Sequence, residues 1–167
     1  MHLLMESVKL EDRLVDERVR EAVTEDQVPE GQHAFMRGKS TANALNHVLQ
    51  DVDEATRNRK KLAILLFLDV AKAFPKLWRS GLIRKLHDKY LVRGSLLLWM
   101  HDNLQGRVGH FRFDGVLSEV VLIEAGLPEG SALSCYLYNL HYDVGDVLRD
   151  MSKQLCCDDV TPYYTFD

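Results

Sequence analysis

The 167-residue sequence lacks several features that mark particular classes of protein. Its three cysteines, Cys135, Cys156 and Cys157, include no C-x-x-C pair, and neighbours in sequence rarely form a disulfide with each other. This pattern favours a reducing compartment and argues against a disulfide framework. Seven histidines occur without metal-ligand spacing, which argues against a zinc site.

Long apolar runs are also missing, so the sequence predicts no membrane-spanning helix. The first 13 residues, MHLLMESVKLEDR, are too acidic and too short in apolar length for a signal peptide. There are no internal repeats and no low-complexity segments. We therefore expect an intracellular protein that is soluble or at most peripheral, with nucleus and cytoplasm both open.

The length suits one domain with a sizeable core, and 46% hydrophobic and 28% charged residues are typical of a globular chain. The net charge of −4 is unevenly distributed. Residues 31–100 carry 13 basic and 5 acidic side chains, whereas residues 101–167 carry 4 basic and 11 acidic ones. A basic middle can attract phosphate and an acidic end can hold metal, although solvated helix faces explain the same charges equally well.

The pattern of apolar residues and turn signals predicts an α+β fold. Periodic apolar residues predict helices, of which the second begins with Ser40 or Thr41 as a cap and the third with Ser80. Strand-like runs on either side of Asp114-Gly115 predict a hairpin. The expected helices cover about residues 3–23, 41–56, 80–90, 95–104 and 131–150, and the tail at 153–167 is expected to form a strand or hairpin.

Asp69 stands directly after an apolar run. Residues 62–68 contain no polar side chain, which predicts a strand that is buried on both faces. An ionised carboxylate at the end of a buried strand is costly unless it is compensated. Asp69 is therefore a candidate for either a structural pairing or a chemical role.

A second acidic cluster, Asp158-Asp159, lies near the end of the sequence. Carboxylates from separate strands can converge on divalent cations such as Mg²⁺, which leaves room for water and phosphate. Two ions about 4 Å apart can activate a 3′ hydroxyl and stabilise the leaving pyrophosphate. From spacing alone, a helix cap for Asp69 and a surface turn for Asp158-Asp159 are the commoner explanations.

The order of four motifs adds a family resemblance. The Asp-Asp pair is preceded, in this order, by QHAFMRGKST at 32–41, FLDVAKAF at 67–74, the hairpin, and GLPEGSALS at 126–134. This series resembles the palm and fingers of reverse transcriptases, most closely those of non-LTR (LINE-type) retrotransposons. The resemblance implies a single partial domain over 1–167, with helices packed on a small antiparallel sheet. It implies fingers-like residues 1–61 and palm-like residues 62–167, with the thumb and the upstream fingers strands absent.

The resemblance assigns roles to residues around the acids. Asp69, Asp158 and Asp159 match the catalytic aspartates, and the carbonyl of Val70 matches a further metal ligand. They would hold two Mg²⁺ ions, with Mn²⁺ as a substitute. Phe74 matches the aromatic residue that packs under the incoming sugar and rejects a 2′ hydroxyl. An ordinary core aromatic is the alternative explanation for Phe74.

Two further segments match substrate-binding parts of the family. GLPEGS matches the loop usually written G-x-P-Q-G-S, which approaches the template and nucleotide. It would contribute Gly126, Pro128, Glu129 and Gly130 to nucleotide binding. A helix-initiating turn capped by Ser131 is compatible with that role. In MRGKST, Arg37 and Lys39 match contacts to the nucleic-acid backbone, and as a lone motif this segment would be only a basic loop.

The sequence departs from the family pattern at several positions. Glu129 replaces the usual Gln, Pro75 stands where Asp is frequent, and Cys156-Cys157 replace an aromatic residue and alanine. YYTFD at 163–167 supplies an aromatic residue before an acid and is an alternative location for the acid pair. We favour Asp158-Asp159 because both acids are present.

The sequence thus favours an RNA-directed DNA polymerase fragment that transfers a nucleotide from dNTP to a primer 3′ end on an RNA template. The partners would be an RNA template, a DNA primer and dNTP, with no membrane and with the oligomeric state open. The first alternative is an inactive retroelement remnant that at most binds nucleic acid. The second is a helical interaction domain with no nucleic-acid role.

Overall fold

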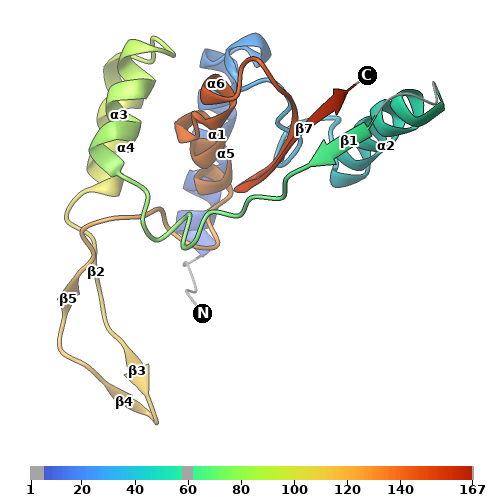
Figure 1. Cartoon of the computed structure of the whole chain (residues 1–167). Coiled ribbons are helices and arrows are strands. Elements are labelled where there is room, and N and C mark those ends of the chain that lie inside the picture. Colours follow the sequence, from blue (N-terminus) through green and yellow to red (C-terminus); the bar gives the residue numbers. More distant parts are fainter. Residues whose placement is uncertain (1–5, 58–61, 167) are drawn as a thin grey trace. The chain divides into compact units, whose positions relative to one another are not determined.

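The structure is a computed structural model that describes residues 6–57 and 62–166 (Figure 1). Its described residues form two compact units. Unit 1 combines residues 6–23 with 72–134, and unit 2 combines 24–57 and 62–71 with 135–166. Each unit is described by itself below. Arg59, Lys60 and Lys61, which belong to the basic middle of the sequence, lie outside the described part of the chain.

Three helices lie entirely within the described residues of unit 1: α1 (Glu6–Ala22), α3 (Arg79–Asp88) and α4 (Gly94–Leu104). Its core includes the buried side chains of Leu82 and Leu86 from α3 and of Met100 and Leu104 from α4. These residues recur at helical spacing, so each helix presents an apolar stripe to the core. The three helices expected in these regions of the sequence are therefore present.

The start of α3 differs from the expected cap at Ser80. The helix begins at Arg79, and Trp78 occupies the position before it with an extended backbone (φ −79°, ψ 99°). A Cβ atom on Gly81 would lie 2.3 Å from the indole ring of Trp78, so the ring covers the first turn closely. Ser80 is thus inside the helix, and its prediction as the cap was wrong.

The hairpin of unit 1 has the expected turn. Strands β2 (Val108–Gly109) and β5 (Val121–Leu122) pair antiparallel, and β3 (Arg112–Phe113) pairs with β4 (Val116–Leu117). Figure 1 shows both ladders along one long ribbon. Asp114 and Gly115 both have positive φ (50° and 82°), as a two-residue type I′ turn requires.

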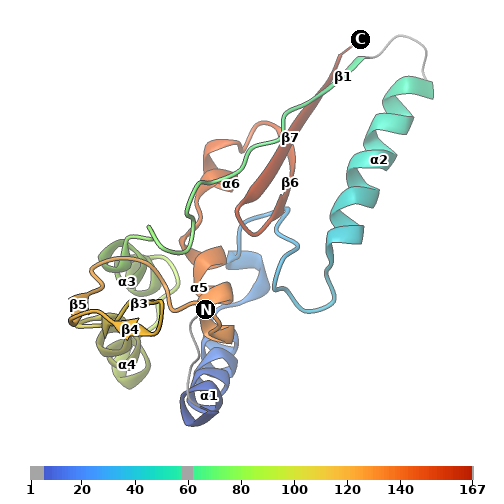
Figure 2. The ribbon, with the colours of Figure 1, turned by 90° about the horizontal axis from the view of Figure 1, so that it is seen from below.

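Unit 2 is a three-stranded antiparallel sheet accompanied by α2 (Thr41–Arg57). The strand order is β1–β7–β6, from β1 (Leu62–Leu65), β6 (Ser152–Cys156) and β7 (Asp159–Phe166). Figure 2 shows these strands side by side, with α2 running beside them. Helix α2 contacts β1, β6 and β7. The backbone N–H of Asn43 donates to the Ser40 hydroxyl oxygen, so the predicted serine cap is present.

A single helix over 131–150 was expected, and the structure corrects this. α5 (Ala132–His141) begins in unit 1 and continues into unit 2, and a separate short α6 covers Val144–Val147. Asp143 leaves the helical conformation with φ −93° and ψ 7°. The side chain of the preceding Tyr142 bonds to the carbonyl of Asp158. The apolar periodicity of the segment does not register this break.

The strand after residue 61 is present, but it is not buried. Leu62 is 75% exposed and Ile64 is 59% exposed, whereas Ala63 and Leu65 are half-buried. β1 is the edge strand of its sheet, and within unit 2 only one of its faces is partly covered. The prediction of burial on both faces was therefore wrong. Asp69 is also exposed, so it carries no burial penalty that a partner must offset.

Candidate active site

The Asp158-Asp159 pair lies at the turn of the β6–β7 hairpin. Cys156 and Asp159 face each other across the ladder, so Cys157 and Asp158 form a two-residue connection. Cys157 has φ +64° whereas Asp158 does not have a positive φ, which is the pattern of a type II′ turn. We call residues 157–159 the acid turn.

Asp69 lies beside the acid turn because β1 continues its pairing beyond Leu65. Leu68 and Val160 exchange two backbone hydrogen bonds of 2.9 Å each, in the register that already pairs Leu65 with Tyr163. Asp69 directly follows Leu68 and Asp159 directly precedes Val160, so one further step of this register would set Asp69 opposite Asp159. Acids from two neighbouring strands therefore meet at one end of the sheet, and the exposed Val70 follows directly.

Two tyrosines from α5 and the residue after it surround the acid turn. Tyr138 and Tyr142 stack with ring centroids 5.5 Å apart, and the Tyr142 hydroxyl donates to the carbonyl of Asp158. Burial, with a further contribution from the charge of Asp158, raises the pKa of Tyr142 to about 12. Asp69 also raises the pKa values of both tyrosines, so the acids act on a common neighbourhood.

The donor chemistry of these acids suits Mg²⁺, although their side chains are not gathered into one ligand cluster. Among residues 6–57 and 62–166, no three or more His, Cys, Asp or Glu side chains stand close enough to hold a metal ion. In nucleotide sites, however, Mg²⁺ is commonly bound by one or two carboxylates together with phosphate oxygens and water. The facing positions of Asp69 and Asp159 supply such a pair.

The residues of YYTFD that the structure describes, 163–166, lie in a different part of the sheet from the acid turn. Tyr163 and Phe166 lie within β7 and pair with Leu65 and Leu62, away from the acid turn. Phe166 lies seven residues further along β7 than Asp159, which corresponds to about 23 Å. Asp167 itself lies outside the described residues.

Apart from Val70, which was also predicted to bind nucleotide and belongs to unit 2, the predicted nucleotide-binding residues belong to unit 1, where two segments are joined through their backbones. We call residues 126–130 the glycine loop. The N–H of Leu127 donates to the carbonyl of Phe74 (3.0 Å), and the N–H of Gly126 donates to the carbonyl of Leu77 (2.9 Å). A Cβ on Gly126, whose φ is +83°, would lie 2.5 Å from the Pro75 carbonyl oxygen. Only glycine therefore allows this approach.

The predicted nucleotide-binding residues of unit 1 differ in how far they are exposed to solvent. Gly126 and Pro128 are buried, Phe74 is half-buried, and Glu129 and Gly130 are exposed. The N–H of Ser134 donates to the Ser131 hydroxyl oxygen, which confirms the predicted cap of α5. The loop therefore offers its second half to solvent while its first half anchors it.

Arg79, which sequence analysis did not single out, holds the segment before the glycine loop. Its buried guanidinium donates to the carbonyl oxygens of Ile123, Ala125 and Gly126, each at 2.7 Å. Burial, followed by the charge of Arg107, lowers the pKa of Arg79. The only sequence signal for this role is a basic residue at the start of an amphipathic helix, which is far more often a solvated one.

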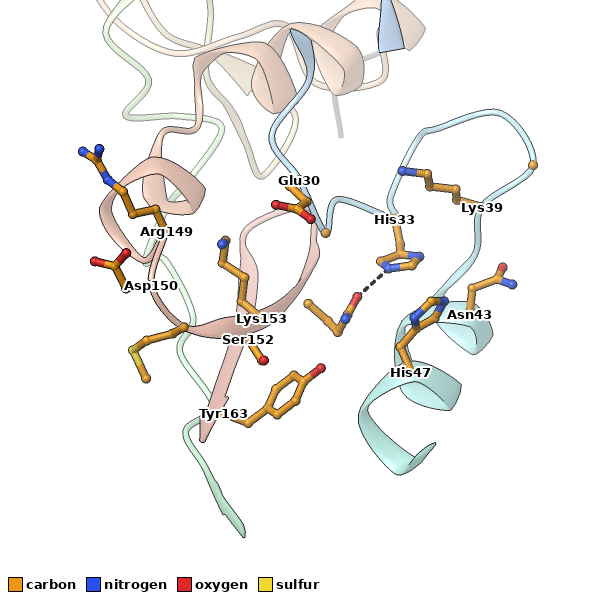
Figure 3. Close-up of a pocket in the computed structure, with 14 residues that line it drawn as sticks. Glu30, His33, Lys39, Asn43, His47, Arg149, Asp150, Ser152, Lys153 and Tyr163 are labelled. Atoms are coloured by element: carbon orange, nitrogen blue, oxygen red, sulfur yellow. Dashed lines mark hydrogen bonds between the residues drawn. The ribbon is translucent and has the colours of Figure 1, made fainter. Parts of the chain in front are cut away.

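Of the two predicted nucleic-acid contacts, Arg37 is exposed and Lys39 lines a cavity of about 670 Å³ in unit 2. Figure 3 shows Lys39 and His33 on one side of this cavity and Lys153 and Arg149 on another. Lys39 Nζ donates to the carbonyl of Gln32 at 3.2 Å. The part of β6 that lines this cavity is its beginning, whereas the acid turn follows the end of β6.

Comparison with known proteins identifies the family. A family model described as reverse transcriptase (RNA-dependent DNA polymerase) matches residues 1–164. The chain therefore belongs to the reverse transcriptase family, as the motif order predicted. Within the described residues, no helix combines the length and apolar character needed to cross a membrane.

The similar proteins come from mobile elements of Drosophila. The RNA-directed DNA polymerase from mobile element jockey of Drosophila melanogaster is 34% identical over 113 residues, or 68% of this chain. Its Drosophila funebris counterpart is 34% identical over 134 residues, or 79% of this chain. The probable RNA-directed DNA polymerase from transposon BS of D. melanogaster is 30% identical over 143 residues, or 83% of this chain. The aligned regions span 12%, 14% and 15% of these relatives.

These relatives confirm the predicted kinship with non-LTR retrotransposon reverse transcriptases. The structure and the family match together confirm the α+β class in its general form, with helices and small antiparallel sheets. The division into fingers-like residues 1–61 and palm-like residues 62–167 stays a prediction. So do the assigned roles of individual site residues.

Proposed function

We propose that this chain is the part of an RNA-directed DNA polymerase that carries its catalytic carboxylates. The reaction would transfer a nucleotide from dNTP to the 3′ end of a DNA primer paired with an RNA template. The observation that carries this proposal is the bridge between Leu68 and Val160, which brings Asp69, the residue after Leu68, beside the acid turn. Membership of the reverse transcriptase family supports it.

In this proposal, Asp69, Asp158 and Asp159 hold divalent cations at the end of the sheet, with the carbonyl of Val70 as a further ligand. When bound, two Mg²⁺ ions would supply Lewis-acid stabilisation of the attacking and leaving oxygens. Mn²⁺ would substitute for them. The contribution of the chain is to fix the two carboxylate-bearing strands in one register, which sets the ligands before substrate binds.

The nucleotide would be positioned by Phe74 and the glycine loop. The bond between Leu127 N–H and the Phe74 carbonyl links the two segments, so they form one support for a sugar and its base. The exposed Glu129 is unusual beside a triphosphate, because two negative groups repel unless a cation lies between them. Arg37 and Lys39 would contact the nucleic-acid backbone through their positive charges.

Primer extension by the full chain, with an RNA template, a DNA primer, dNTP and Mg²⁺, tests the proposal. We expect extension that Asp69→Asn lowers by at least about 100-fold, since even groups that only orient metal ligands contribute about 10–100-fold. Asp53→Asn is the matched control. Asp53 is an exposed carboxylate of the same unit, paired with Arg57 on α2, and its loss should leave extension unchanged.

Two outcomes would contradict the proposal. Extension that Asp69→Asn leaves intact would remove Asp69 from the site. An absence of extension, accompanied by RNA binding that weakens steeply with salt and persists in Asp69→Asn, would support an inactive remnant that binds nucleic acid through its basic side chains.

A further inference from the structure

Gln32, which is only 1% exposed, is bonded to the acid turn through both ends of its side-chain amide. Its Nε2 donates to the carbonyl of Cys157 at 3.3 Å. Its Oε1 accepts from the N–H of Cys157 at 3.1 Å and from the N–H of Ala34 at 3.0 Å. One buried side chain therefore bonds both backbone groups of the residue at which the chain turns.

The backbone around Gln32 is itself fixed beside β6. The N–H of Leu155 donates to the carbonyl of Gly31 (2.8 Å), and the N–H of His33 donates to the carbonyl of Leu155 (2.9 Å). A Cβ on Gly31 would lie 2.8 Å from the carbonyl oxygen of Lys153, so the approach needs glycine. This segment thus joins β6 through one isolated parallel bridge, between Gln32 and Leu155, and Gln32 reaches the turn from a defined position.

The acid turn needs such a partner because Cys157 is buried and is not glycine. A residue with a side chain at φ +64° adopts the left-handed region at a cost of about 1 kcal/mol. Its N–H and C=O lie outside the hairpin ladder, which ends with Cys156 and Asp159. Buried backbone groups without a partner are strongly disfavoured. The amide of Gln32 satisfies both groups in this one conformation.

We propose that Gln32 is a positioning residue for the catalytic carboxylates: it fixes Cys157, and thereby the direction in which Asp158 and Asp159 present their side chains. This inference rests on the proposed function of the acid turn. It gives the QHAF segment a role in metal binding, in addition to the nucleic-acid contacts proposed for Arg37 and Lys39. Gln32 itself touches neither metal nor substrate.

Hydrogen exchange of individual backbone amides in the full chain tests the contact directly. Gln32→Met keeps the length of the side chain and removes its hydrogen bonds. The exchange rate of the Cys157 amide should rise about tenfold, whereas that of Leu155, bonded to Gly31, should stay unchanged. An unchanged exchange rate at the Cys157 amide would contradict the proposed role of the Gln32 hydrogen bonds. A rise at both amides would show that Gln32 merely holds the sheet together, which would also overturn it.

Mn²⁺ affinity, measured by electron paramagnetic resonance of the free ion, tests the consequence for the carboxylates. Gln32→Met should raise the dissociation constant about tenfold, the lower range for groups that orient metal ligands. The control Gln154→Met makes the same chemical change on β6, where the Gln154 side chain bonds to His33. It should leave both the Cys157 amide and the Mn²⁺ affinity unchanged.

The outcomes separate this inference from the proposed function. An unchanged Mn²⁺ affinity in Gln32→Met, with faster exchange at Cys157, would show that Gln32 serves the fold alone and would overturn its positioning role. Mn²⁺ binding that weakens in Gln32→Met, in a chain that extends no primer, would support the positioning role while contradicting the polymerase activity. Wild-type chain that binds no Mn²⁺ would contradict both.

Discussion

The glycine loop and the acid turn both depend on a backbone with positive φ, but they hold it by different means. In the glycine loop, Gly126 at φ +83° lies so close to the Phe74 and Pro75 carbonyls that no side chain fits. In the acid turn, Cys157 adopts φ +64° with its side chain buried, and Gln32 bonds to both of its backbone groups. The loop thus depends on the glycine itself, whereas the turn depends on the side chain of a residue 125 positions away.

The two segments also differ in the polar side chain that supports each of them. Arg79 supports the glycine loop with a charged guanidinium bonded to three carbonyls, and Gln32 supports the acid turn with a neutral amide. A buried charge whose partners are neutral carbonyls is costly to disturb, because its removal leaves several acceptors without donors. A neutral clamp beside carboxylates avoids placing a fixed positive charge where a cation is proposed to bind.

The largest effect on stability is expected at Arg79. Arg79→Ala leaves the carbonyls of Ile123, Ala125 and Gly126 without their donor and should lower the free energy of unfolding by about 3 kcal/mol. Urea unfolding of the full chain measures this. The control is Arg84→Ala, on the same helix as Arg79, which removes an exposed guanidinium that lies over the Trp78 ring. It should lower the free energy of unfolding by less than about 1 kcal/mol. Equal losses would contradict the role assigned to Arg79.

The next largest effect on stability is expected when the residue with positive φ is changed in each segment. Gly126→Ala should destabilise the chain by about 2 kcal/mol, since it adds a Cβ against two carbonyls at a positive φ. Cys157→Gly should change stability by less than about 1 kcal/mol, because relief of the left-handed conformation offsets the greater freedom of the unfolded chain. Thermal unfolding of both variants measures the contrast. Similar losses in the two would contradict the distinction drawn between them.

A smaller effect concerns pH and belongs to the acid turn. The pKa of Tyr142 is raised to about 12 by burial and then by Asp158, so the folded chain keeps this proton when the unfolded chain has lost it. The resulting stabilisation is complete below pH 10 and is lost as the pH rises from 10 to 12. Tyr142→Phe should reduce this decline, measured as urea midpoints between pH 9 and 11. An identical decline in Tyr142→Phe would contradict the assignment.

Much of the fold follows from local patterns in the sequence. Apolar periodicity predicts α1, α2, α3 and α4, and Asp114-Gly115 predicts the type I′ hairpin because both residues tolerate positive φ. Serine caps at Ser40 and Ser131 are likewise local. Each of these features needs only neighbouring residues, so one sequence is enough to predict it.

The remaining features depend on residues far apart in the chain. The exposure of β1 could not be predicted, because an apolar run indicates a strand without saying how many of its faces are covered. Arg79 and Gln32 contact segments 44–47 and 125 residues away, and neither has a local motif that marks a buried clamp. The meeting of Asp69 with Asp159 likewise depends on strand register, which the acids themselves do not determine.

The central claim is that Asp69 and Asp159, on neighbouring strands, bind the same cation. A double-mutant cycle tests this claim. The dissociation constant for Mn²⁺ is measured for the unaltered full chain, for Asp69→Asn, for Asp159→Asn and for the double variant. We predict that each single change raises the dissociation constant by about tenfold or more. We also predict that the double change raises it by less than the product of the two. Effects that multiply, or single variants that bind Mn²⁺ like the unaltered chain, would contradict a shared site.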